Sequence, residues 1–352
     1  MKWSCFMKDQ AGRTIDYMRI SLTDRCNLRC RYCMPHDIKK IEMSQLLTYE
    51  EIVVIAKCAV ELGIVNFKLT GGEPLVRKNV PVLVEMLKAI PGVKTVTITT
   101  NGTLLSSYAK ELKKAGLDGI NVSLDTLDAD AFAKLTGHTF PLSSVLEGIK
   151  AVQQAEIPVK LNTVNRRDLD WKTILSYAKD QHLVVRFIEM MPIGYGKDYM
   201  GTSNEILFAQ IQELYGTGIP VTERKGNGPA KYYRFENYPD EIGFISAIHH
   251  KFCDTCNRIR LSSEGYLKLC LCYEQGMNLR KLLRDGSSMK EIKAQMQQAI
   301  ARKPLEHCFS EKEKMMVFGK GGPQKCSSPE NFWFTAVPAF VRFCPSTSVR
   351  TR

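Results

Sequence analysis

The sequence of 352 residues predicts an α/β fold built around a parallel β-sheet. Short runs rich in apolar and β-branched residues alternate with segments in which apolar residues recur at helical spacing. Strand, helix and strand follow one another at intervals of about 25 to 40 residues, which is typical of βαβ units. About six such units precede residue 190, whereas a complete barrel has eight. An open, doubly wound sheet is the competing arrangement, and periodicity alone does not decide between the two.

The predicted elements follow one another along the chain. Strands are expected at residues 15–21, 65–70, 93–99, 120–124, 159–163 and 184–188. Thr48-Tyr-Glu-Glu51 has the form of a capping box and opens a helix that continues to Leu62. Further helices are expected at residues 106–115, 143–155, 171–181, 203–215 and 281–303. Gly226-Asn-Gly-Pro229 interrupts this pattern, so we place a boundary near residues 220–240.

The composition is that of an ordinary globular protein, with 44% hydrophobic and 24% charged residues. No apolar stretch reaches the roughly 18 residues that a membrane helix needs. The first thirteen residues lack an apolar segment of the kind found in secretion signals, so we expect a cytoplasmic protein. The net charge of +12 favours anionic partners, either nucleic acid or phosphates.

Three of the twelve cysteines form a group in Cys26-Asn-Leu-Arg-Cys30-Arg-Tyr-Cys33. Three neighbouring thiolates can hold an iron–sulfur cluster or a zinc ion. A structural zinc takes four ligands, and the nearest fourth candidate is His36. A cubane cluster is usually held by four cysteines, so three would leave one iron open to a small molecule.

A second group comprises Cys253, Cys256, Cys270 and Cys272. Its spacing alone is also that of a four-thiolate zinc ribbon. Arg258 and Arg260 follow in an extended segment, where two guanidinium groups can bind an anion.

Further candidate residues stand at the ends of the predicted strands. Thr70-Gly-Gly-Glu-Pro74 lets the backbone approach a ligand closely. Thr99-Thr-Asn-Gly102 ends a strand, and its Asn-Gly pair is mainly a turn signal. Asn121-Val-Ser-Leu-Asp125 ends the next strand, where ligands of parallel barrels bind. Lys160 lies in an apolar strand and needs an anionic partner there.

The first cysteine group resembles the cluster motif of the radical S-adenosylmethionine (SAM) enzymes. Residues from about Asp16 to Arg302 resemble one branch, the GTP 3′,8-cyclases that begin molybdenum cofactor (molybdopterin) biosynthesis. The resemblance implies an incomplete parallel (βα)6 TIM-type barrel with a C-terminal iron–sulfur cluster module. Residues 1–230 would form the barrel, residues 231–310 the auxiliary-cluster and GTP module, and residues 311–352 a poorly ordered tail.

The resemblance also implies cofactors and binding residues. Two [4Fe-4S] clusters would be held by Cys26, Cys30 and Cys33 and by Cys253, Cys256 and Cys270, which leaves Cys272 out. SAM would contact Tyr32, Gly72, Ser123 and Met191. GTP would contact Arg19, Lys68, Thr99, Lys160, Arg258, Ile259 and Arg260.

The implied reaction is that of a lyase, which converts GTP to (8S)-3′,8-cyclo-7,8-dihydroguanosine 5′-triphosphate. A 5′-deoxyadenosyl radical derived from SAM would abstract the hydrogen from carbon 3′ of the ribose. An electron donor such as flavodoxin or ferredoxin would be needed, nucleic acid and membrane would not be partners, and a homodimer is possible. Two alternatives are a radical SAM enzyme acting on a peptide and a zinc-ribbon protein that binds nucleic acid.

Three features depart from the family pattern. Lys68 stands where the family usually has arginine, and lysine lacks the bidentate fork. The loop after Asn162 is shorter than usual. The family's chain ends in a free diglycine, whereas thirty residues follow Gly321-Gly322 here.

Overall fold

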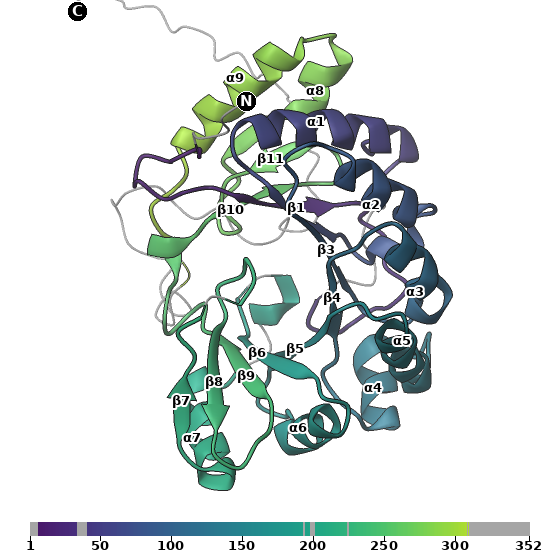
Figure 1. The fold of residues 1–352 in the computed structure, drawn as a ribbon, viewed down its shortest axis with the longest axis vertical. Helices are drawn as coiled ribbons and strands as arrows, with labels where there is room; N and C mark the ends of the chain where they lie inside the picture. The colour runs from purple at the N-terminus through teal and green to yellow at the C-terminus, as the bar shows by residue number, and fades with distance from the viewer. Residues whose placement is uncertain are drawn as a thin grey trace, which may run out of the picture.

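The computed structural model describes residues 6–33, 41–192, 194–197, 201–223, 225–307 and 309. Twelve strands in these residues form one sheet, in the order β12-β11-β10-β1-β2-β3-β4-β5-β6-β9-β8-β7. The six central strands are parallel and curve around a common axis (Figure 1). They are β1 (Tyr17–Ser21), β2 (Asn66–Thr70), β3 (Thr95–Thr100), β4 (Gly119–Ser123), β5 (Val159–Asn165) and β6 (Val184–Glu189). All six predicted strands are therefore confirmed, and the sheet has the form of a partial barrel.

Strands from the C-terminal part of the chain extend both edges of this sheet. On one side β10 (Arg258–Leu261) runs parallel to β1, followed by the antiparallel strands β11 (Tyr266–Lys268) and β12 (Gly276–Asn278). On the other side β9 (Glu241–Ile245) runs parallel to β6, followed by β8 (Lys231–Phe235) and β7 (Gly218–Pro220). The chain that links β9 to β10 must therefore cross the open side of the barrel.

The helices cover the outer face of the barrel (Figure 1). They are α1 (Tyr49–Glu61), α2 (Val80–Lys88), α3 (Leu105–Lys114), α4 (Ala129–Thr136), α5 (Leu142–Gln154), α6 (Trp171–Asp180), α7 (Asn204–Tyr215), α8 (Leu279–Arg284) and α9 (Met289–Ala301). The predicted capping box is confirmed: the Thr48 hydroxyl accepts from the Glu51 N–H, and the Glu51 carboxylate accepts from the Thr48 N–H. Helices α2 and α4 were not predicted from the sequence.

The prediction of a single helix over residues 281–303 is wrong. The structure has two helices, α8 and α9, separated by a turn at Gly286, where φ is +82°. That left-handed conformation ends α8 and suits glycine. Ser288 then caps α9, and its capping box with Glu291 starts the new helix.

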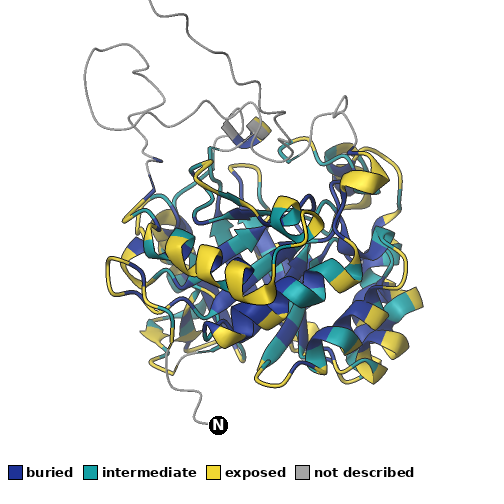
Figure 2. Cartoon of the chain, turned by 90° about the horizontal axis from the view of Figure 1, so that it is seen from above, coloured by how far each residue is buried: buried dark blue, intermediate teal, exposed yellow. Residues whose placement is uncertain are grey.

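The two faces of the parallel strands differ in polarity. Outward residues such as Ile20, Phe67 and Ile98 are fully buried beneath the helices. The alternate, inward residues are polar and only half-buried, as Arg19, Lys68 and Thr97 illustrate. Seen from above in Figure 2, the helices are buried on the side that faces the sheet and exposed on the outer side. The barrel therefore encloses a polar inner face rather than an apolar core.

Candidate functional site

The first cysteine group follows the carboxyl end of β1. Cys26, Cys30 and Cys33 are half-buried and lie within electrostatic reach of one another. Burial, followed by repulsion from Cys26 and Asp125, raises the pKa of Cys33 to about 12. Free thiolates are therefore disfavoured here, and positively charged iron bound to the sulfurs would reverse that balance. This donor set fits a cluster held by three cysteines.

Asn101 is a site residue that the sequence analysis treated only as part of a turn. Its side-chain N–H donates to the sulfur of Cys26 at 3.8 Å and to Asn27 Oδ1 at 2.8 Å. The Leu28 N–H also donates to the Cys26 sulfur, at 3.4 Å. Hydrogen bonds to sulfur tune clusters in proteins, so Asn101 belongs to the candidate site.

Tyr32, between two of these cysteines, is tied to the end of β4. Its hydroxyl donates to Asp125 Oδ2 at 2.5 Å, and Asp125 Oδ1 accepts from the Val164 N–H at 2.8 Å. Arg166 lies 3.9 Å from the same Asp125 carboxylate and 6.0 Å from the centre of the Tyr32 ring. These contacts fix the cysteine loop against the carboxyl ends of β4 and β5. Asp125 and Arg166 had no assigned role in the sequence analysis.

The glycine motif packs directly against the cysteine loop. The Gly72 N–H donates to the Thr23 carbonyl at 2.8 Å, and a Cβ on Gly72 would lie 2.8 Å from the Asp24 carbonyl. Glu73 is buried and accepts from the Thr100 hydroxyl, the Asn101 N–H and the Leu75 N–H. Burial raises the pKa of Glu73 to about 7, and these hydrogen bonds act in the opposite direction. The motif therefore joins β2, β3 and the first cysteine group.

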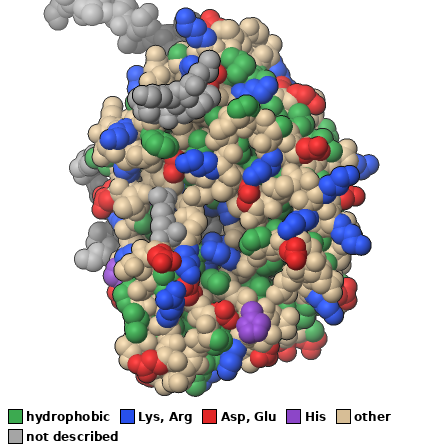
Figure 3. All heavy atoms as spheres, viewed as in Figure 1, with side chains coloured by type: hydrophobic (Ala, Val, Ile, Leu, Met, Phe, Trp, Pro, Cys, Tyr) green, Lys and Arg blue, Asp and Glu red, His purple; other side chains and the backbone are tan. Residues whose placement is uncertain are grey.

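A ring of cations lies on the inner face of the barrel. It consists of Arg19, Lys68, Lys160, Arg186, Arg258 and Arg260, all half-buried. Figure 3 shows lysine and arginine side chains around the hollow near the middle of the view. We call these six residues the cation ring.

Several members of the cation ring lack a carboxylate partner. Burial, followed by repulsion from Arg186, Arg19 and Lys160, lowers the pKa of Lys68 well below its usual value. Burial, followed by repulsion from Arg19 and Arg258, lowers the pKa of Arg260 to about 9, although Cys270 and Cys256 act in the opposite direction. No carboxylate of the described residues offsets these two groups or Arg19, and the buried Arg19 Nε has no hydrogen-bond partner among them. Such an arrangement calls for an anionic ligand.

Other predicted contacts lie on the same inner face. Lys160 Nζ donates to the Tyr232 hydroxyl at 3.3 Å and stands 5.0 Å above that ring. Thr99 accepts a hydrogen bond from Asn121 at 3.4 Å, and Ser123 ends β4 beside them. Arg186, which the sequence analysis did not single out, donates to Asn162 Oδ1 at 2.9 Å.

The second cysteine group lies across the open side of the barrel. Cys253 and Cys256 precede β10. Cys270 packs against the cluster of Cys272 and Phe309, as do Met191 and Ile248, which follow β6 and β9. The group therefore bridges the two edges of the partial barrel. Burial alone would raise the pKa of Cys256, but Arg258 and Lys303 lower it to about 7.

Two predicted contact residues, Ile259 and Met191, are placed differently from a simple side-chain contact. The side chain of Ile259 is fully buried in the core on the outer face, so only its backbone can face a ligand. Met191 packs with the apolar cluster of Cys272 and Phe309, beside the second cysteine group. His36 and Gly321-Gly322 lie outside the described residues.

No three Cys, His, Asp or Glu side chains converge on a single metal-ion position within the described ranges.

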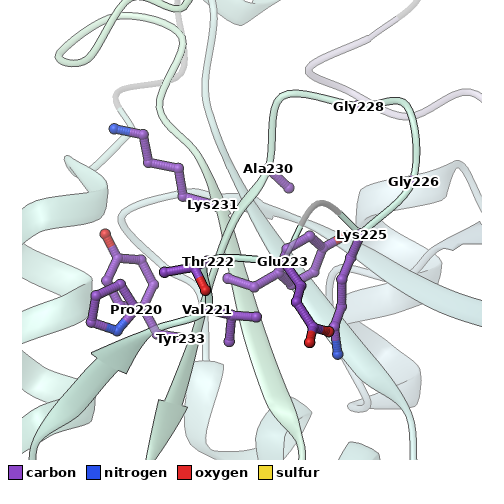
Figure 4. Close-up of a pocket in the computed structure, with 11 residues that line it drawn as sticks. Pro220, Val221, Thr222, Glu223, Lys225, Gly226, Gly228, Ala230, Lys231 and Tyr233 are labelled. Atoms are coloured by element: carbon purple, nitrogen blue, oxygen red, sulfur yellow. The ribbon is translucent and has the colours of Figure 1, made fainter.

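A separate pocket of about 250 Å³ lies beside the β7–β8 hairpin (Figure 4). Its walls include Thr222, Lys225, Lys231 and Tyr233. Tyr232 also lines it and contacts Lys160 of the cation ring. None of the predicted site residues is among those that line this pocket, so it adjoins the candidate site without forming part of it.

The chain is similar in sequence to known families and proteins. Residues 20–180 match a model of the Radical SAM superfamily, and residues 183–309 match a model named Molybdenum Cofactor Synthesis C. A protein from Clostridium perfringens named GTP 3′,8-cyclase is 42% identical over 312 residues, which cover 88% of this chain and 96% of that protein. Another of that name, from Syntrophomonas wolfei, is 44% identical over 329 residues and covered completely, with 90% of this chain aligned.

The fold is also found in solved structures. SuiB of Streptococcus suis, bound to its precursor peptide SuiA, matches with a TM-score of 0.58 at 15% identity. The match covers 83% of this chain and 65% of SuiB, and at this identity it shows the fold alone. None of the described helices has the length and apolar character needed to cross a membrane. The sequence relatives decide between the alternatives left open above, and the chain belongs to the GTP 3′,8-cyclase family of the radical SAM superfamily.

Proposed function

We propose that the two cysteine groups and the cation ring form one active site, which converts GTP to (8S)-3′,8-cyclo-7,8-dihydroguanosine 5′-triphosphate. The observation that carries this proposal is the position of the cation ring. Arg19 and Arg260 lie on adjacent strands that connect the two groups, since β1 leads to Cys26 and β10 begins beside Cys256. A five-residue strand spans roughly 16 Å, which suits a nucleotide bound between them.

Cys26, Cys30 and Cys33 would hold the first [4Fe-4S] cluster, and Cys253, Cys256 and Cys270 the second. When bound, the first would supply an electron to SAM and the second an open iron to the guanine. The family relatives and the thiol environments described above support this assignment. Cys272 would stay outside the ligand set, because the family spacing uses Cys253, Cys256 and Cys270.

The protein's own residues bind and orient the two substrates. Lys68, Lys160 and Arg260 offer positive charge to the triphosphate, and a buried guanidinium or ammonium gains most from such a partner. Gly72 and Ser123 border the first cysteine group, where the methionine part of SAM would lie. Tyr32 is held by Asp125, so the loop that carries the first group is fixed before SAM binds.

The role of this chain is to bind the substrates through charged side chains, rather than to react with them through side chains of its own. The cofactors carry out the difficult bond-breaking, while the protein positions the substrates and excludes water. The reaction also requires an external one-electron donor. A flavodoxin or ferredoxin is the class that we propose, in the reducing cytoplasm, and a homodimer is compatible with the fold.

Anaerobic reconstitution followed by incubation with SAM and a reductant tests the proposal. We expect release of 5′-deoxyadenosine that depends on GTP and is not supported by ATP. The six ligand cysteines should hold about eight irons per chain. Release that is equally fast without GTP would contradict the proposal.

A further inference from the structure

Lys303 is a buried cation beside the second cysteine group. It follows α9 and is only 4% exposed. Its ammonium donates to the Leu269 carbonyl at 2.5 Å, immediately before Cys270. Burying an ammonium group is costly unless it is paired with an anion.

No carboxylate among the described residues pairs with Lys303. The neighbouring cation, Arg13, has its own partner, because its Nε lies 2.6 Å from Asp9. The anionic groups within electrostatic reach of Lys303 are the sulfurs of Cys256 and Cys270, whereas Arg13 and Arg258 repel it. The sulfurs of a bound cluster would therefore supply negative charge that this buried ammonium otherwise lacks.

The surrounding backbone holds Lys303 and the cysteines in one unit. Arg13 donates to the carbonyls of Cys253 at 2.9 Å, Pro304 at 2.7 Å and Leu305 at 2.7 Å. Arg13 thus ties the start of the second cysteine group to the segment that carries Lys303. This clamp keeps the ammonium beside the sulfurs.

We propose that Lys303 is a buried counter-ion of the second cysteine group, beside Arg258, and that its charge stabilises the bound cluster and raises the potential at which this cluster accepts an electron. The inference rests on the proposed function in one respect, that this group holds a cluster. Reduction adds negative charge to the cluster, and a nearby cation favours that change. Lys303 is a positioning and tuning residue, since it acts through the ligand sulfurs.

The test compares wild type with Lys303→Met and Lys303→Gln. Glutamine retains a donor for the Leu269 carbonyl but removes the charge. The matched control is Lys293→Met, on the neighbouring exposed face of α9, where Lys293 pairs with Glu61 at 2.6 Å. The readouts are the rate of iron loss to a chelator, the rise in Tm on cluster loading, and the midpoint potential from electron paramagnetic resonance. The signal that SAM leaves unchanged belongs to the second cluster.

We expect both Lys303 variants to lose the second cluster roughly 10-fold faster than wild type. Their second midpoint potential should be more negative, and the rise in Tm on loading should be smaller. The apo form of Lys303→Met should melt at or above the wild-type temperature, because an unpaired buried charge is gone. Lys293→Met should match wild type throughout.

Two results would overturn the inference in distinguishable ways. If wild type retains both clusters and the Lys303 variants match Lys293→Met in potential and iron loss, Lys303 is not the counter-ion. If wild type binds only about four irons, the proposed second cluster itself is absent. The first result leaves the proposed function intact, whereas the second rejects its ligand assignment.

Discussion

Arg19 on β1 lies directly opposite Arg260 on β10, in a parallel pair whose register places both on the inner face of the barrel. Like charges in directly opposite positions destabilise a sheet. Lys68 continues the row on β2, opposite Arg19 on the other side. The fold therefore keeps three cations side by side with no carboxylate to offset them. This arrangement lowers the stability of the nucleotide-free protein and favours the binding of an anion.

Replacing Lys68 by methionine should separate the effect of this charge on stability from its effect on GTP binding. We expect Lys68→Met to raise the Tm of the nucleotide-free protein, because a buried, repelled ammonium is removed. The same variant should bind GTP at least roughly 10-fold more weakly, since a buried charge-assisted contact is worth about 1.5–3 kcal/mol. Differential scanning calorimetry and equilibrium binding measure the two effects. Lys110→Met, on the exposed surface of α3, is the control and should change neither.

The pH dependence of stability follows from the same group. The pKa of Lys68 is lowered in the folded protein, so above that value the unfolded chain binds more protons than the folded one. The stability of the nucleotide-free protein should therefore rise with pH, from the folded pKa of Lys68 up to its ordinary value near 10.4. Lys68→Met should flatten this rise. Denaturant unfolding at a series of pH values gives the slope, and an unchanged slope in the variant would reject the assignment.

Gly72 should tolerate no side chain. A Cβ at this position would collide with the backbone of Asp24 and Arg25, immediately before Cys26. We expect Gly72→Ala to displace the first cysteine group, to abolish SAM binding and to leave about four irons in the second group. Gly228→Ala is the control, since nothing lies within 4 Å of the added methyl group. Iron analysis and SAM titration check this, and normal SAM affinity in Gly72→Ala would contradict it.

The hydroxyl of Tyr32 should contribute to stability and to SAM binding. Tyr32→Phe removes the 2.5 Å hydrogen bond to the buried Asp125 carboxylate, at a cost of about 1–3 kcal/mol. Tyr49→Phe loses a hydrogen bond to the Lys78 carbonyl far from this loop and should cost less. Urea unfolding of the apo proteins gives the free energies. Only Tyr32→Phe should raise the KM for SAM, and equal KM values in the two variants would speak against this role.

Cys272 and Cys270 should behave differently although they are two residues apart. Cys272→Ala should retain about eight irons per chain, whereas Cys270→Ala should lose roughly half of them. Cys272 is buried against Phe309, so the alanine variant should lower Tm slightly without changing the cluster signals. Iron and sulfide analysis of the reconstituted proteins decides. Loss of the second cluster in Cys272→Ala would contradict this assignment and favour a site with four thiolate ligands.

The sequence predicts the strands well because each follows a simple alternation, as in Met18, Arg19 and Ile20. It also predicts the cysteine groups and the glycine motif, whose chemistry is local. It misses Arg13 and Lys303, since only the fold brings them to their partners: Cys253 is 240 residues from Arg13, and Leu269 is 34 residues from Lys303. The contact of Asn101 with Cys26 was not predicted, because an Asn-Gly pair is most often part of a turn. The break at Gly286 could have been found, because Asp-Gly within a helical pattern is a turn signal.

The most direct test of the central claim follows the hydrogen that is removed from GTP. GTP carrying deuterium at carbon 3′ of the ribose is incubated with the anaerobically reconstituted protein, SAM and a reductant, and 5′-deoxyadenosine is analysed by mass spectrometry. We predict one deuterium in 5′-deoxyadenosine from this substrate and none from GTP labelled at carbon 2′ or 4′. Unlabelled 5′-deoxyadenosine from the 3′-labelled substrate would contradict the binding of GTP between the two cysteine groups.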